Sequence, residues 1–190
     1  VEPPHDCPCP YGTAVTVEFN EANGVTRQHG DYVTQLGYDI TVATSGGGYT
    51  DEGPRIYDTS GAFPGNDEDL AANVGKVLIV QETKGDLPDD NAGGGSIEFS
   101  FPIPVFMRSM LVLDTEKSAT VVANRGGPRG VQLARIRGPA VADKETATIS
   151  VNTGNIDFLG VTFPEAGAVV ELAICIPVCV NDSEIVDSGC

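Results

Sequence analysis

The sequence contains no tryptophan and only two histidines, His5 and His29, among its 190 residues. No serine lies in a nucleophile-elbow motif, and no His-rich metal motif occurs. Both histidines are interpreted as solvated loop residues, and no pattern in the sequence signals a Ser-His-Asp site. We therefore expect a protein that is not an enzyme.

Basic residues are also scarce, since 11 lysines and arginines face 27 aspartates and glutamates, which gives a net charge of −16. The phosphates of nucleic acids and the surfaces of anionic membranes both attract Lys and Arg side chains. A chain this acidic argues against both classes of partner. Because it also repels itself, divalent cations should favour its compact or assembled form.

Long apolar runs are missing. The longest, Leu172–Val180, is interrupted by Pro177 and is much shorter than the roughly 18 residues of a membrane-spanning helix. The chain begins with Val1 and not with methionine, which we interpret as a mature chain whose leader has been removed. We expect no membrane span and a secreted, extracellular or cell-surface location.

The five cysteines lie at the two ends of the chain: Cys7, Cys9, Cys175, Cys179 and Cys190. Terminal disulfides make sense outside the reducing cytosol, where such bonds persist. The sequon Asn181-Asp182-Ser183 lies in a polar tail and predicts a glycan on Asn181. Both features agree with an extracellular location.

The cysteine spacing is not that of a zinc finger, and Cys7 and Cys9 are too close in sequence to pair comfortably with each other. A cross-link between this pair and Cys175/Cys179 is geometrically easier. It would tie the N-terminal arm to the last strand, within one chain or between neighbours. One cysteine, most simply Cys190, then stays free or finds a partner on another molecule.

Apolar and polar residues alternate with a period of two along most of the chain, which is typical of β-strands. Gly, Pro, Asn and Asp separate the alternating segments. Roughly ten strands are predicted, at 15–19, 32–44, 76–82, 97–101, 105–113, 119–123, 131–137, 146–151, 156–163 and 168–176. This number of strands predicts an all-β fold, a two-sheet antiparallel β-sandwich of the jelly-roll type.

The two ends differ in composition from the body. Residues 1–12 hold four prolines and two cysteines and are predicted to form an extended arm. Residues 13–180 form the predicted jelly roll, and residues 181–190 form an acidic tail, in which Ile185 and Val186 are the apolar residues. An arm or tail can add a strand to the sheet edge of a neighbouring molecule.

Two acidic, glycine-rich loops bracket the predicted strand at 76–82, and we expect them to converge at one rim of a sheet. Carboxylate, amide and backbone oxygens are the ligands that Ca²⁺ takes, about six to eight at a time. The alternatives are two solvated loops, or a glycosidase acid/base pair, which the scarcity of aromatics disfavours. The candidate calcium ligands are Asp58, Asn66, Asp67, Asp69, Asp89, Asp90 and Asn91.

The same region carries a resemblance. The segments Tyr57-Asp58, Pro64–Leu70, Val77–Glu82 and Pro88–Phe101 are similar to a family of secreted, cell-surface jelly-roll domains of bacteria and algae, which resemble galactose-binding-like sandwiches. The resemblance implies the sandwich fold, a surface location and calcium at the loops. The chain departs from the family pattern at Leu87, where the family usually has aspartate.

The one basic region contains Arg125, Arg129, Arg135 and Arg137, with no acidic residue between the first and the last. One interpretation is that these arginines pair with the acidic loops of their own chain. The other is that they form an interface for the acidic face of another subunit, or for an anionic polysaccharide. A contact between unlike faces of identical subunits generates an open filament unless rotation closes it.

Two functions fit these features. The first is a non-catalytic extracellular structural glycoprotein, a subunit of a filament or matrix that polymerises with copies of itself, head to tail or by strand addition, and is stabilised by calcium and disulfides. The alternative is a calcium-dependent carbohydrate-binding, lectin-like module, in which Tyr49, Tyr57 and Phe63 stack on sugars. We favour the structural role, because tryptophan is absent and we expect no attached catalytic domain for such a module to serve.

Overall fold

The computed structural model describes residues 12–22, 25–61, 68–85 and 87–177, and these residues contain strands but no helix. The first six strands are β1 (Gly12–Glu18), β2 (Glu21–Ala22), β3 (Val25–Thr26), β4 (Gln35–Leu36), β5 (Ile40–Ser45) and β6 (Arg55–Asp58). The others are β7 (Lys76–Ile79), β8 (Gly95–Leu113), β9 (Thr120–Arg125), β10 (Val131–Arg137), β11 (Thr146–Phe163) and β12 (Ala168–Pro177). The expected all-β antiparallel sandwich is confirmed.

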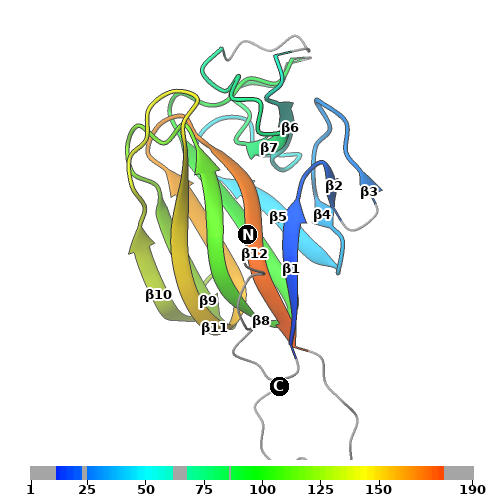
Figure 1. The fold of residues 1–190 in the computed structure, drawn as a ribbon, viewed down its shortest axis with the longest axis vertical. Helices are drawn as coiled ribbons and strands as arrows, with labels where there is room; N and C mark the ends of the chain where they lie inside the picture. Colours follow the sequence, from blue (N-terminus) through cyan, green and yellow to red (C-terminus); the bar gives the residue numbers. More distant parts are fainter. Residues whose placement is uncertain (1–11, 23–24, 62–67, 86, 178–190) are drawn as a thin grey trace, which may run out of the picture.

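The strands form two layers that share the long strands β8 and β11 (Figure 1). In the first layer, the order is β10-β9-β11-β8-β5-β4, built on the second half of β11 and the first half of β8. In the second layer, the other halves of β11 and β8 pair with each other, and β8 pairs with β12. On its other side, β12 pairs with β1 and, near its start, with β7, which pairs with β6.

The prediction of separate strands at 97–101 and 105–113 is wrong, because β8 runs through both. Pro102 and Pro104 lie in its middle, where β8 passes from one layer to the other. Proline cannot donate to a ladder, but a bend of this kind tolerates it. The two strands predicted at 146–151 and 156–163 are likewise one strand, β11, whose pairing with β8 shifts register where Asn152 and Asn155 adopt positive φ.

The single strand predicted over 32–44 is also wrong, because this segment contains the short hairpin β4–β5. Tyr38 and Asp39 have φ of 56° and 55°, which turns the chain back so that Leu36 pairs with Ile40. The alternating pattern continues across the turn, so periodicity alone did not reveal it. Strand β6 had no prediction at all.

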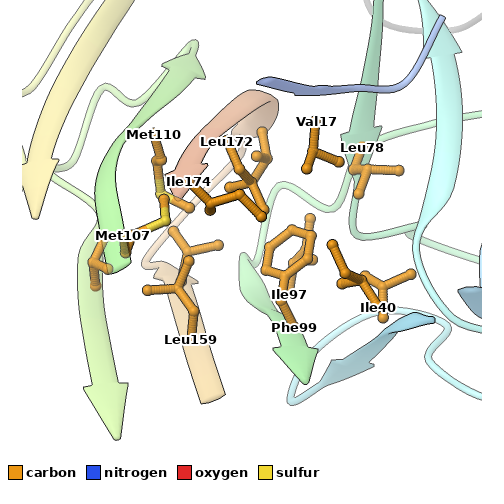
Figure 2. Packing of buried hydrophobic residues seen from close by; sticks show 14 of the residues in the cluster. Val17, Ile40, Leu78, Ile97, Phe99, Met107, Met110, Leu159, Leu172 and Ile174 are labelled. Carbon is orange, nitrogen blue, oxygen red and sulfur yellow. The ribbon is translucent and has the colours of Figure 1, made fainter. Parts of the chain in front are cut away.

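The main core lies between the two layers and receives side chains from both (Figure 2). Phe99 and Met107 come from the two halves of β8, Leu159 from β11 and Leu172 from β12, and all four are fully buried. The strand β7 is buried on both faces. Its Leu78 packs into the main core, and its Val77 and Ile79 pack with Leu70 in a smaller cluster on the other face.

The outer face of the second layer carries two glutamates directly opposite each other, Glu18 on β1 and Glu171 on β12. Glu18 is exposed and Glu171 is partly buried. Burial, and then the charge of Glu18, raise the pKa of Glu171 above its ordinary value of 4.5. Like charges at directly opposed positions destabilise a strand pair, on a scale of roughly 0.2–1 kcal/mol.

We predict that Glu171→Gln raises the melting temperature at neutral pH. The folded-state pKa is raised, so the cost of ionising Glu171 is absent below the ordinary glutamate pKa and grows as the pH rises through that value towards the folded-state pKa. The gain from the substitution should therefore vanish at pH about 3, where glutamates are protonated. Thermal melts of wild type, Glu171→Gln and the exposed control Glu145→Gln at both pH values test this. An equal gain at both pH values would contradict it.

Candidate functional site

The strand pair β6–β7 determines where the acidic loops lie. Asp58, at the end of β6, is opposite Lys76 at the start of β7, whereas Gln81, just after β7, bridges to Asp90. Lys76 and Gln81 are five residues apart, or roughly 17 Å along an extended chain. The expectation that both loops converge at one rim is wrong, because loops that precede and follow a single strand emerge at its opposite ends.

Asp58 has hydrogen-bonded neighbours of its own. Its Oδ1 accepts a bond from the Ser60 amide at 3.0 Å, and its backbone amide donates to His29 Nδ1 at 3.0 Å. Burial alone would raise the pKa of Asp58, but the Ser60 hydrogen bonds and the charges of Lys76 and His29 outweigh it and hold that pKa below its ordinary value. His29 is partly buried and packs edge-on against Tyr57 at 5.7 Å, so its interpretation as a solvated residue is wrong.

The second acidic loop is tied together by its polar side chains. The buried Asp90 accepts a hydrogen bond from the Gly167 amide at 3.0 Å. The Asn91 amide group accepts a bond from the Gly93 amide and donates to the Gly94 carbonyl. A Cβ on Gly94, at φ 72°, would lie 2.1 Å from the Phe163 carbonyl oxygen, so glycine is required for this close approach.

Asp69 lies in the loop before β7, and its backbone carbonyl accepts a hydrogen bond from the Lys144 amide. Asn66 and Asp67 are outside the described residues. Within residues 12–22, 25–61, 68–85 and 87–177, no three His, Cys, Asp or Glu side chains are grouped so that they can hold a metal ion. The calcium site stays a prediction.

Cys175 is buried on β12 and is disulfide-bonded. The other cysteines and the sequon asparagine, Cys7, Cys9, Cys179, Cys190 and Asn181, lie outside the described residues. The connectivity, the odd cysteine and the glycan therefore stay predictions.

The loop end of the sandwich is organised around the buried Arg55, which the sequence analysis missed. Its guanidinium donates to the carbonyls of Gly30 at 3.0 Å, Gly85 at 2.7 Å and Leu87 at 3.2 Å. It also lies 4.9 Å from the ring centroid of Tyr32. One side chain thus joins two loops that are far apart in the sequence.

A pocket of about 390 Å³ opens beside this clamp, lined by Tyr32, Glu52, Lys84 and Gly85. Tyr49 packs edge-on against Tyr32 at 6.1 Å and donates to Glu52 at 3.0 Å, and Lys84 lies 5.5 Å from the Tyr49 ring centroid. The pocket combines partly exposed aromatic rings with charged hydrogen-bonding groups. Only Tyr49 was anticipated here.

Of the three aromatics expected to stack on sugars, Tyr57 is contradicted by the structure. Tyr57 is 4% exposed and belongs to the small core cluster, so it cannot stack on a ligand. Phe63 lies outside the described residues. Tyr32 escaped notice because it comes from a different loop, and only the fold places it beside Tyr49.

The four arginines of the basic region lie on and around β10, which ends the first layer. Arg135 and Arg137 are exposed and alternate with Ala134 and Ile136, which pack against the core. Arg129 is also exposed, in the turn before β10. Among the described residues, Arg125 alone of the four has an ion pair, with Asp157 on β11 at 3.8 Å, and none pairs with the acidic loops.

Asp157 fixes the turn that leads into β10. Its carboxylate accepts hydrogen bonds from the amides of Gly126 and Gly127 at 2.9 Å. Burial alone would raise the pKa of Asp157, but these bonds and the charge of Arg125 outweigh it and hold that pKa below its ordinary value. The basic strand is therefore held in a defined position.

Two apolar side chains add to the exposed surface of β10. Val131 is 68% exposed and Leu133 is 42% exposed. Leu133 lies at a bulge, where the pairing with β9 shifts register between Gln132 and Ala134. The edge of the first layer is thus both basic and apolar.

No family model and no curated protein matches the sequence. Solved structures with a similar fold include the F5/8 type C domain of a Bacteroides fragilis protein (TM-score 0.33, 13% identity, 46% of this chain and 68% of that one). A second is the lectin-binding domain of lectinolysin in complex with Lewis b (TM-score 0.39, 9% identity, 78% of this chain and 97% of that one). A third is a fucolectin from the serum of striped bass, Morone saxatilis (TM-score 0.32, 13% identity, 87% of this chain and 46% of that one). These neighbours are jelly-roll domains of the galactose-binding-like type, and at such identities the likeness concerns the fold alone.

The search for membrane-spanning helices gave a negative result: the described part of the chain holds no helix long and apolar enough to cross a bilayer.

We predict that Arg55→Met lowers the free energy of unfolding by at least about 2 kcal/mol. The methionine keeps the apolar stem but removes the side-chain donor to the Gly30 and Gly85 carbonyls, whereas the Leu87 carbonyl keeps its bond from Gln81. An unsatisfied buried polar group costs roughly 1–3 kcal/mol. Urea denaturation measures the change. Arg129→Met, at an exposed arginine, should stay within about 0.5 kcal/mol of wild type. Equal midpoints for the two variants would refute the clamp.

Proposed function

We propose that the chain is a non-catalytic, extracellular structural subunit that assembles with copies of itself through the basic edge strand β10. The observation that carries this proposal is an exposed sheet edge on a molecule of net charge −16, at which Arg129, Arg135 and Arg137 have no ion pair among the described residues.

Edge strands present unpaired backbone groups to other chains, and proteins often protect them with charged side chains. Charged side chains keep the edges of identical copies from pairing when the charge of the edge has the same sign as the net charge of the rest of the molecule, because the copies then repel each other. Here the sign is opposite. The four arginines contribute +4, so the rest of the chain carries −16 − 4 = −20. The charges on β10 therefore attract other copies.

Acidic surfaces that can receive this strand occur on the same molecule. Glu116 and Asp143 are exposed next to each other, and their mutual hydrogen bond, together with the charge of Asp143, raises the pKa of Glu116. Complementary charges steer association and suppress wrong orientations, and salt screens both effects. A contact between unlike faces of identical subunits extends indefinitely unless it closes into a ring.

Calcium and disulfides are part of the proposal as stabilisers of the subunit. A divalent cation would offset the repulsion within the acidic loops, and carboxylates with amide oxygens are suitable ligands. Cys175 provides the one disulfide half within the described residues.

A second candidate function is carbohydrate binding at the pocket of Tyr32, Glu52 and Lys84. Aromatic rings stack on the apolar faces of sugars, and charged groups nearby can bind their hydroxyls. The pair of tyrosines with Lys84 and Glu52 at hydrogen-bonding positions favours this candidate. The two functions use different surfaces, so they can be tested separately.

The assembly is tested by analytical ultracentrifugation at about 50 and 500 mM NaCl, over which range screening increases strongly. Wild type should self-associate at low salt and dissociate at high salt with its fold intact. Arg135→Gln/Arg137→Gln should weaken association at least about tenfold. The control Thr146→Glu/Thr148→Glu reaches the same net charge, −18, on exposed positions of the other layer and should associate like wild type.

Negative-stain electron microscopy in millimolar calcium and in EDTA completes the assembly experiment. Filaments that disappear in EDTA would support both the assembly and its dependence on calcium. A wild-type chain that stays monomeric under all of these conditions would overturn the structural role.

The carbohydrate candidate predicts binding of the wild-type monomer, kept in high salt, to a defined glycan on an array. Tyr49→Ala should lose at least about tenfold in affinity, because it removes a stacking ring. Phe106→Ala, at an aromatic outside the pocket, should bind like wild type. An absence of binding to any glycan would remove this candidate and leave the assembly test unaffected.

A further inference from the structure

An apolar pocket of about 300 Å³ lies at the corner of the sandwich where β8 passes between the layers. The β4–β5 hairpin contributes Tyr38 and Ile40, the bend of β8 contributes Phe101 and Ile103, and the end of β12 contributes Ile176. Tyr38 is 54% exposed and Ile103 is 44% exposed, so the pocket opens onto two apolar side chains at the surface.

The described residues expose large apolar side chains in three places. Tyr38 and Ile103 lie at this pocket, Val131 and Leu133 lie on β10, and Leu87 lies in a loop next to the Arg55 clamp. Single exposed apolar residues are ordinary on protein surfaces, whereas grouped ones mark interaction sites. One group lines a pocket and the other lies on the edge strand β10.

The β4–β5 hairpin, which lines one side of the pocket, and β10 lie at opposite edges of the same layer (Figure 1). A single row of paired residues crosses the layer from one edge to the other: Gln132, Asn124, Phe158, Ser100, Thr41 and Gln35. Val131 and Leu133 flank the first residue of this row on β10. Tyr38 and Ile40 lie just beyond its last residues. The two apolar groups are therefore at the same height on the sheet, about 24 Å apart at the usual strand spacing.

We propose that Val131 and Leu133 of one copy insert into the Tyr38–Ile103 pocket of the next copy. This inference rests on the proposed self-assembly and identifies the surface that receives β10. The inserted strand β10 and the pocket that receives it lie at opposite edges of the layer and at the same height. Each copy that binds through its pocket therefore leaves its own β10 free to bind a further copy. Such a heterologous contact extends a row of subunits.

The charges around the two surfaces favour a second copy as the occupant. Among the described residues that line the pocket, Asp39 alone is charged, and Gln35 donates to its carboxylate at 3.1 Å. Arg129 and Arg135 flank the apolar residues of β10 and have no ion pair within the described part of the chain. Arg27, in an adjoining depression, donates to the Gln35 carbonyl. The single carboxylate of Asp39 at the pocket can thus meet the arginines that flank Val131 and Leu133, and complementary charges orient association.

The test uses two variants that each destroy one side of the contact. Leu133→Asp removes the inserted side chain and leaves the pocket intact, and Ile103→Asp does the reverse. Each should raise the dissociation constant for self-association at least about tenfold, since burial of one aliphatic side chain contributes roughly that factor or more. Both positions are exposed in the monomer, and thermal melts check that each variant is folded.

Mixing the two variants is the decisive measurement. The intact β10 of Ile103→Asp should bind the intact pocket of Leu133→Asp and give a 1:1 dimer that grows no further. Light scattering coupled to size-exclusion chromatography measures its mass. The control Leu87→Asp introduces the same charge at the third exposed position and should assemble like wild type. Tyr38→Asp is a second pocket variant and should behave as Ile103→Asp does.

The outcomes separate this inference from the proposed function. If wild type assembles in a salt-sensitive way and Ile103→Asp and Tyr38→Asp assemble equally well, the pocket is not the receiver and the inference is overturned, while self-assembly stands. A mixture in which both variants stay monomeric also overturns it. If wild type does not assemble at all, the proposed function and this inference fall together.

Discussion

The pairing of β8 with β11 in both layers is the constraint on which the rest of the structure depends. Each strand is long enough to belong to both layers, and each changes layer at an irregularity, at the prolines of β8 and the positive-φ asparagines of β11. Because the two strands pair with each other on both sides of the bend, the layers cannot move independently. The apolar pocket lies at this bend of β8, next to the end of β12.

Charge is distributed unevenly over this acidic sandwich, so that one edge of the first layer differs from the rest of the molecule. Most acidic side chains are spread over loops and outer faces, whereas the arginines between residues 125 and 137 gather at one edge. The carboxylate of Asp157 holds the turn before that edge strand through two backbone amides. A rigid basic edge on an acidic body makes the two ends of the layer unlike, and unlike ends are what head-to-tail association needs.

The loop end has a different organisation, which is internal to the molecule. The Arg55 guanidinium donates hydrogen bonds to carbonyls of two loops and lies over the ring of Tyr32. The carboxylates of Asp58 and Asp90 are likewise occupied as acceptors for backbone amides. These hydrogen bonds join the described parts of the loops, and the tyrosine pocket is an accessible feature of that end.

The fold class was predictable from the sequence, because alternation in segments separated by Gly, Pro, Asn and Asp is a local property that two-sided sheets require. The cluster of arginines and the acidic loops were equally visible as composition. The tertiary structure alone decided which segments join into β8 and β11, that Asp58 and Asp90 lie at opposite ends of β7, and that β10 is an edge. It alone brought Tyr32 to Tyr49 and Tyr38 to Ile103 and Ile176. The reason is physical: strand pairing joins residues that are distant along the chain, and the energy of that pairing resides in contacts that no local pattern records.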